Sequence, residues 1–156
     1  MKLVSNCSPL IFLAKLNFLE LLSGDRLLVP SEVQEELLRK ESVEKDKIQR
    51  FLSEKNVAVL KVKKSRDFSE ALGKGEMATI NLALEKKITN VLMDDRRARS
   101  LAKIHKLRPR GTLWIILRAY KNGVINKSQA REIIYELPSV GFRVDMEFLF
   151  QILKTL

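Results

Sequence analysis

The sequence predicts an α/β fold whose central parallel sheet is covered by helices on both faces. Short apolar segments typical of buried strands alternate along the chain with longer segments in which apolar residues recur at helical spacing. Such alternation is typical of a parallel sheet with right-handed crossover connections. The chain has 156 residues, of which 46% are hydrophobic, and contains no internal repeat or long linker. We therefore expect one domain over residues 1–156.

The first strand and the first helix are predicted close to the start of the chain. Leu3–Ser5 is a short strand. We expect a single helix from about Ser8 to Leu22, with Ser8 as its N-cap and Pro9 at its first position, because both residue types favour these positions. Gly24 stands where a helix C-terminus favours a left-handed residue, so we expect it to end this helix.

Two further strands are predicted in the next part of the chain. Leu27–Val29 is the second strand, and Ser31 followed by Gln34 forms a capping-box pattern that starts the next helix. The mixed-charge stretch Lys40–Lys47 fits either a solvated helix or a loop. Val57–Val62 is the third strand, because valine and leucine alternate within it.

The second half of the chain is predicted to hold the fourth strand and most of the helices. The turn Gly73–Gly75 leads to a helix from about Glu76 to Lys87, and Asn90–Met93 is the fourth strand. The later helices are bounded by recognisable caps and breaks. They are a helix capped by Asp95 and ending near Ile104, a helix capped by Thr112 and followed by Gly123, an amphipathic helix over Ala130–Leu137, and a last helix capped by Asp145.

The composition indicates a basic protein of a reducing compartment. The formal net charge of +10 favours nucleic acid, acidic partners or anionic surfaces without choosing among them. Cys7 is the one cysteine, which excludes an internal disulfide and any multi-cysteine zinc site, so we expect a cytoplasmic protein. The apolar stretch Leu10–Leu22 is interrupted by Lys15 and Glu20 and is too short to span a bilayer, so we expect a buried helix and no membrane contact.

Polar residues follow two of the predicted strands. Asn6 comes directly after the first strand, and Asp94 and Asp95 follow the fourth. Open parallel sheets bind ligands at the carboxyl ends of their strands, near the switch in strand order. If the first and fourth strands are neighbours, Asn6 and Asp94 lie side by side. We assign capping of the next helix mainly to Asp95 and metal binding to Asp94, because that helix needs only one cap.

Two glutamates on predicted helices are candidates for the same site. Glu36 borders the buried stripe formed by Val33 and Leu37, although a solvated acidic face explains it equally well. Glu76 lies one turn before Ile80 and so aligns with the apolar stripe, although taken alone it more often marks a dipole-favoured helix start. Carboxylates crowded into one pocket repel, so we expect raised carboxyl pKa values in the metal-free protein.

A strongly basic stretch directly follows the proposed metal ligand Asp94. Cations beside an acidic centre would hold a phosphate backbone while a metal acts on one linkage. The alternative is a soluble helix that exposes its charges. The stretch contains no acidic residue between its members, which are Arg96, Arg97, Arg99, Lys103, Lys106, Arg108 and Arg110.

Taken together, these motifs resemble the PIN-domain proteins, and most closely the branch related to VapC-type toxins. The matching segments occur in the right order over nearly the whole chain and are Val4–Ile11, Val29–Pro30, Glu36–Leu37, Gly73–Glu76, Leu92–Arg97 and Gly111–Leu113. The resemblance implies a three-layer PIN-like fold with a central parallel sheet of four or five strands between helices. It also implies a ribonuclease centre that uses Mg²⁺ or Mn²⁺.

Carried over by position, the resemblance assigns each candidate a role. The catalytic and metal-binding positions are Asn6, Glu36, Glu76 and Asp94, with Ser8 and Thr112 as hydroxyl supports and Asp95 as an auxiliary carboxylate. One position departs from the family pattern, because most active relatives have an aspartate where this chain has Asn6. An amide oxygen can bind a metal but cannot supply the missing charge, so metal affinity and activity should fall.

The sequence therefore supports two hypotheses from different classes. The first is a metal-dependent ribonuclease that hydrolyses RNA phosphodiester bonds as the toxin of a toxin–antitoxin pair. The second is a catalytically impaired module that binds RNA or protein, with Asn6 as the sign of lost chemistry. A phosphotransfer domain is disfavoured because Asn6-Cys7-Ser8 lacks a nucleophilic aspartate. The resemblance implies a small antitoxin partner and a homodimer, and the apolar last helix could form an interface, although completion of the core is the safer expectation.

Overall fold

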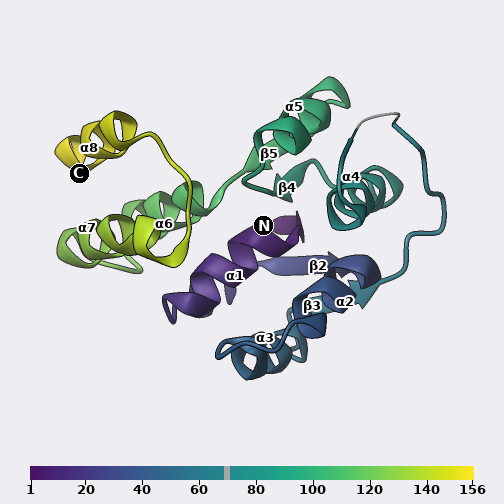
Figure 1. Ribbon diagram of the computed structural model, residues 1–156, viewed down its shortest axis with the longest axis horizontal. Helices are drawn as coiled ribbons and strands as arrows, with labels where there is room; N and C mark the ends of the chain where they lie inside the picture. The colour runs from purple at the N-terminus through teal and green to yellow at the C-terminus, as the bar shows by residue number, and fades with distance from the viewer. Residues whose placement is uncertain (69–70) are drawn as a thin grey trace.

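The computed structural model describes residues 1–68 and 71–156 and shows an all-parallel five-stranded sheet (Figure 1). The strand order is β3-β2-β1-β4-β5, and every neighbouring pair runs parallel. The strands are β1 (Lys2–Ser5), β2 (Arg26–Pro30), β3 (Val57–Leu60), β4 (Asn90–Leu92) and β5 (Arg108–Arg110). The predicted α/β class with a central parallel sheet is confirmed.

Helices cover both faces of this sheet and give it a three-layer arrangement. They are α1 (Cys7–Lys15), α2 (Ser31–Arg39), α3 (Lys45–Leu52), α4 (Lys74–Lys86), α5 (Arg96–Ile104), α6 (Thr112–Lys121), α7 (Lys127–Glu136) and α8 (Met146–Thr155), with 3₁₀ turns η1 (Leu19–Leu22) and η2 (Leu137–Val140). Successive strand residues point to opposite faces, so Leu3 and Val4 enter two different apolar clusters. The cluster with Val4 includes residues of α4 and α5, and the cluster with Leu3 includes residues of α1, α3, α6 and α7.

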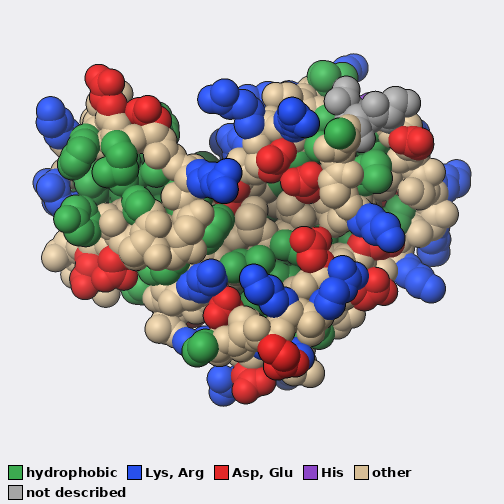
Figure 2. Space-filling model, in the orientation of Figure 1, with side chains coloured by type: hydrophobic (Ala, Val, Ile, Leu, Met, Phe, Trp, Pro, Cys, Tyr) green, Lys and Arg blue, Asp and Glu red, His purple; other side chains and the backbone are tan. Residues whose placement is uncertain are grey.

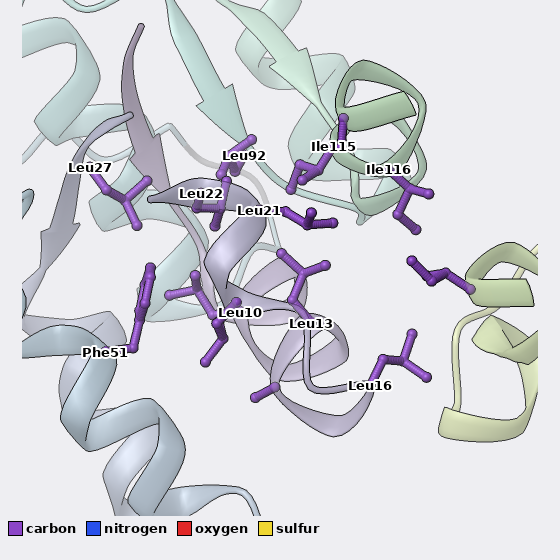
Figure 3. Close-up of a cluster of buried hydrophobic side chains, with 14 of the residues drawn as sticks. Leu10, Leu13, Leu16, Leu21, Leu22, Leu27, Phe51, Leu92, Ile115 and Ile116 are labelled. Atoms are coloured by element: carbon purple, nitrogen blue, oxygen red, sulfur yellow. The ribbon is translucent and has the colours of Figure 1, made fainter. Parts of the chain in front are cut away.

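The larger cluster is built around α1. Figure 3 shows Leu10 and Leu13 of α1 among side chains from the sheet and from α3 and α6. Both leucines are fully buried, as are Leu92 of β4 and Ile115 of α6. This packing fixes α1 against the sheet, and its first residue therefore stands directly at the carboxyl end of β1.

The predicted helix from Ser8 to Leu22 is wrong in its second half. α1 ends at Lys15, because Asn17 adopts a left-handed conformation with φ of 62°. Asn17 N–H donates to Ala14 O at 3.1 Å and Phe18 N–H donates to Leu13 O at 2.8 Å, which is the Schellman pattern of helix termination. The left-handed role expected of Gly24 thus belongs to Asn17. No helix within the described ranges is long and apolar enough to cross a membrane.

Three of the predicted N-caps are also wrong. The caps of α1, α2 and α6 are Asn6, Pro30 and Gly111, one or two residues before the predicted Ser8, Ser31 and Thr112. The physical reason is that each of these helices starts at once after a strand or its last turn residue. The cap position therefore falls on the last strand residue, Pro30, or on the residue directly after the strand, Asn6 or Gly111, and the hydroxyls become free for other contacts.

The remaining cap predictions are confirmed or shifted slightly. Asp95 accepts a hydrogen bond from Ala98 N–H at 2.9 Å, and Asp145 accepts one from Phe148 N–H at 3.0 Å, so both aspartates cap their helices as expected. The helix predicted from Glu76 begins two residues earlier, at Lys74. Glu76 consequently occupies the third helical position and not the first.

Candidate active site

The site lies where the strand order reverses. β1 pairs in parallel with both β2 and β4, and Asn6 N–H extends the β1–β4 ladder by donating to Leu92 O at 2.9 Å. The expectation that the first and fourth strands are neighbours is confirmed. Asn6 and Asp94 therefore leave adjacent strands at the same edge of the sheet, which is where open α/β sheets bind their ligands.

A cavity of about 770 Å³ opens at this edge. Six of the seven predicted catalytic and supporting residues line it, namely Asn6, Ser8, Glu36, Glu76, Asp94 and Asp95. The seventh, Thr112, is fully buried behind Asp94. Figure 2 shows this face as hollowed, with acidic side chains inside the hollow and Lys and Arg side chains around it. Residues separated widely in the chain are thus brought to one cavity.

Asp94 is held in a single orientation by the start of α6. Thr112 N–H donates to Asp94 Oδ1 at 2.8 Å, and the Thr112 hydroxyl donates to Oδ2 at 2.7 Å. Burial raises the pKa of Asp94, whereas the bonds from Thr112 and from the Ser8 hydroxyl, together with the charge of Arg99, act to lower it. The hydroxyl supports predicted at Ser8 and Thr112 therefore both contact this carboxylate.

Glu76 caps the start of α4 and also lines the cavity. Its Oε2 accepts a hydrogen bond from Gly73 N–H at 3.0 Å, so the helix-start interpretation holds as well. Burial is the main cause that raises the pKa of Glu76, and repulsion from Asp95 and Glu36 adds to it. The expected raised pKa is confirmed for Glu76 and Asp94, but desolvation contributes more than the predicted crowding.

Glu36 and Asn6 meet at Gly75 of α4. A Cβ built on Gly75 would stand 2.9 Å from Glu36 Oε2 and 3.2 Å from Asn6 Oδ1. Only a glycine leaves room for both oxygens at this point. Glu36 is exposed to solvent on α2, and the close approach of α2 to α4 carries it into the cavity wall. Glu36 is thus solvent-exposed, as the solvated-face alternative expects, and also lines the cavity.

Adding a methyl group at Gly75 tests this arrangement. We expect Gly75→Ala to weaken divalent-metal binding about tenfold, because the Glu36 carboxylate must move away from Asn6. The free energy of unfolding should stay constant or rise by about 0.5–1 kcal/mol, since alanine favours a helix more than glycine does. Calorimetric titration with Mn²⁺ and thermal denaturation measure the two effects.

Gly73→Ala is the matched control for that variant. Its added Cβ would make only an ordinary contact, at 3.7 Å from Glu76 Oε2, and its φ of −67° suits alanine. Metal affinity should therefore change little. Equal affinity in the Gly75→Ala protein and the wild type would show that the convergence of Glu36 and Asn6 has no part in metal binding.

The donor set suits a hydrated hard cation. Within residues 1–68 and 71–156, no three Asp, Glu, His or Cys side chains lie close enough to form a ready-made metal cage. The cavity instead offers the carboxylates of Glu36, Glu76 and Asp94 and the amide oxygen of Asn6. Hard divalent cations that keep several waters need only one or two carboxylates from the protein, so these oxygens could hold a hydrated divalent cation.

Cys7 borders the site without being its nucleophile. Its thiol is 6% exposed, and Sγ lies 3.7 Å from the carbonyl oxygen of Val33. Burial and the adjacent Glu36 raise the pKa of the Cys7 thiol strongly, so it stays protonated. Cys7 is therefore a small buried side chain of the core.

The basic stretch after Asp94 divides into groups with different surroundings. Arg96 lines the cavity, whereas Arg97 and Lys103 are exposed along α5. Arg99 turns inward, where its Nη1 donates to Met93 O at 3.1 Å. The Arg110 guanidinium lies over the Trp114 ring at 5.1 Å. The alternative of a uniformly exposed charged helix therefore does not describe Arg99 or Arg110.

Sequence reasoning missed the wall of the cavity that the C-terminal part of the chain contributes. Gly141, Phe142 and Arg143 line it together with Ile11 and Phe12 of α1. No residue of 141–143 belongs to a recognisable motif. Only the break at Gly141 is visible in the sequence, and it does not indicate which cavity the turn would approach.

Comparisons with known proteins bear on the family of this chain. Residues 2–156 match the model of the family DUF3368, which is described as a PIN domain. Comparisons with curated proteins and with solved structures give no significant match. PIN domains are typically nucleases that use divalent metals, which agrees with an acidic cavity at the carboxyl end of a parallel sheet. Because the match spans almost the whole sequence, the chain belongs to the PIN-domain family.

Proposed function

We propose that this protein is a Mg²⁺- or Mn²⁺-dependent endoribonuclease that hydrolyses RNA phosphodiester bonds. The observation that carries the proposal is the convergence of Asn6, Glu36, Glu76 and Asp94 on one cavity. A role as the toxin of a toxin–antitoxin pair, with a small antitoxin and a homodimeric form, rests on the resemblance to the VapC-like branch alone.

Each side chain of the cavity has a part in this chemistry. A divalent ion held by these oxygens would lower the pKa of a bound water and stabilise the leaving oxygen. Thr112 binds both carboxylate oxygens of Asp94 and so fixes the orientation of this side chain. Glu36 on α2 and Asn6 after β1 add two more oxygen donors. Glu76 Oε2 accepts the Gly73 N–H, which leaves Oε1 as the Glu76 oxygen that could hold the cation or accept a proton from a water.

The charge distribution supports a polyanionic substrate. The chain carries a net charge of +10, yet acidic side chains occupy the hollow and cations surround it (Figure 2). A phosphate backbone can therefore be attracted by the surrounding surface while one linkage meets the acidic centre. The choice of RNA among polyanions rests on the family.

The second candidate function is an impaired PIN module that binds RNA or a protein partner. The observation in its favour is Asn6, which is 5% exposed and stands at the centre of the site with a neutral amide. A neutral donor attracts a divalent cation less than a carboxylate does. Such a module would keep the cationic surface and lose turnover.

Restoring the carboxylate distinguishes the two functions. We expect Asn6→Asp to tighten Mn²⁺ binding by about tenfold or more, because it adds a full negative charge beside Glu36. Asn122→Asp adds the same charge at an exposed position after α6 and should leave the affinity unchanged. Calorimetric titration of the three proteins measures this. Equal gains in both variants, or no gain in Asn6→Asp, would count against the site.

Cleavage of end-labelled RNA tests the function itself. We expect wild-type protein to cut the RNA in Mn²⁺ and to lose this activity in EDTA. Cleavage by Asn6→Asp but not by the wild type would select the impaired module. If both proteins bind Mn²⁺ and neither cuts RNA, the nuclease proposal fails.

A further inference from the structure

The turn 141–143 forms one wall of the cavity although it lies far from every family motif. Figure 1 shows the connector that leads into α8 on the other side of α1 from α4. Gly141, Phe142 and Arg143 of this connector line the same cavity as Glu36 of α2 and Glu76 of α4. The acidic donors therefore share their cavity with an arginine and an aromatic ring.

Local contacts hold the turn in place. Gly141 has φ of 95° and donates its N–H to Pro138 O at 3.2 Å, and Phe142 N–H donates to Leu137 O at 3.2 Å. The Phe142 ring packs edge-on against Phe12 of α1, with ring centroids 5.3 Å apart and planes at 84°. The residue before Arg143 is therefore packed against α1, the helix whose N-cap is Asn6.

Arg143 has a free charge at this position. Its side chain is exposed, and it forms no ion pair or hydrogen bond with any residue in the described ranges. Arg118, by contrast, is committed to Asp25 at 2.5 Å, and Arg99 to a backbone carbonyl. Arg96 at the start of α5 is the other arginine of the cavity wall. Two cations from distant parts of the chain thus border one acidic centre.

We propose that Arg143 binds a phosphate of the RNA substrate adjacent to the linkage held at the carboxylates. This inference rests on the proposed function and adds a substrate-binding residue that lies outside the segments matching the PIN-domain proteins. A polyanion that enters an acidic cavity needs nearby cations to offset repulsion, and a guanidinium can hold a phosphate through two parallel hydrogen bonds. The apolar surface of Phe142 and Phe12 next to it suits an unstacked base of the same nucleotide.

RNA binding measured without metal tests the proposal independently of catalysis. The probe is a fluorescein-labelled single-stranded oligoribonucleotide, titrated in EDTA and followed by anisotropy at several salt concentrations. We expect Arg143→Ala to weaken binding about three- to tenfold at low salt and to reduce the slope of log K against log salt by about 0.7, the contribution of one phosphate contact on a single strand. Arg143→Lys should keep the slope and lose part of the affinity, because it keeps the charge without the planar fork.

Lys154→Ala is the matched control, since it removes one exposed cation from α8 outside the cavity. Its affinity and salt slope should equal those of the wild type. The proposal is overturned if Arg143→Ala keeps the wild-type affinity and slope, if Lys154→Ala loses as much as Arg143→Ala, or if the wild type does not bind the RNA. Because EDTA prevents turnover, the binding titration does not depend on cleavage. A failure of the nuclease proposal would appear only in the cleavage assay, and the effect of Arg143→Ala on binding could still be interpreted.

Discussion

Asp94→Asn is expected to lower Mn²⁺-dependent RNA cleavage by at least about a hundredfold while the protein stays folded. Loss of partners that only support a metal ligand typically costs about 10- to 100-fold, and removal of the ligand charge should cost more. The fold should persist, because the new amide oxygen can still accept from Thr112 N–H and the Thr112 hydroxyl can turn to accept from the amide. Initial rates on labelled RNA and thermal denaturation measure both effects.

The neighbouring aspartate provides the matched control. Asp95 is exposed and caps α5 by accepting from Ala98 N–H at 2.9 Å. Asparagine caps a helix about as well as aspartate, so Asp95→Asn should keep the fold, and cleavage should fall by less than in Asp94→Asn because Asp95 is only an auxiliary carboxylate. Equal losses of cleavage in Asp94→Asn and Asp95→Asn would contradict the assignment of Asp94 as the metal ligand and Asp95 as the helix cap. Equal cleavage by Asp94→Asn and the wild type would point to a contaminating nuclease.

The parts of the fold that the sequence predicts well are those set by local periodicity. The apolar strands β1, β2 and β4, and the amphipathic helices α5, α7 and α8, lie close to their predicted positions. The break after α1 was missed because Phe18, Leu19 and Leu22 continue the apolar pattern past the helix end. What stops the helix is the left-handed backbone of Asn17, which no periodicity reveals.

The fifth strand cannot be located from the sequence for a related reason. β5 has the sequence Arg-Pro-Arg and lacks the apolar pattern of a strand. It forms because it lies at the edge of the sheet, where Pro109 needs no N–H for a further neighbour and only β4 pairs with it. The position of β5 in the fold determines that it is a strand. Its pairing with β4 and the Gly111–Thr112 segment after it fix the path of the chain.

Some residues of the candidate site can likewise be predicted from the sequence, and others cannot. The residues at strand ends and helix starts, Asn6 and Asp94 among them, are predictable because topology alone places them at one edge of the sheet. The inward turn of Arg99 and the approach of Arg143 depend on side-chain contacts and on the path of a distant connector. Charge patterning in the sequence cannot separate a cation that binds a backbone carbonyl from one that faces a cavity.

The largest loss of stability is expected from Arg118→Ala. Asp25 is 5% exposed, and Arg118 binds it through two bonds, from Nη1 to Oδ1 at 3.0 Å and from Nη2 to Oδ2 at 2.5 Å. Without Arg118, the ion-pair partner that the described residues leave to the buried carboxylate is the amino group of Met1, at 3.4 Å. Breaking a buried ion pair from one side typically costs about 3 kcal/mol or more, which lowers Tm by about 6–12 °C in a protein of this size. Chemical and thermal denaturation measure the change.

Two further variants separate the ion pair from the aromatic contact that Arg118 also makes. Arg118 and Arg110 both lie over the Trp114 ring, at 4.6 and 5.1 Å, but within residues 1–68 and 71–156 only Arg118 of the two forms an ion pair with a carboxylate. Arg110→Ala should therefore cost only about 1 kcal/mol. The double variant Asp25→Ala with Arg118→Ala removes the stranded charge, so its loss should fall short of the summed single losses by about 1–3 kcal/mol. Equal losses in Arg118→Ala and Arg110→Ala, with strict additivity, would show that the pair with Asp25 adds nothing to stability beyond the contact with Trp114.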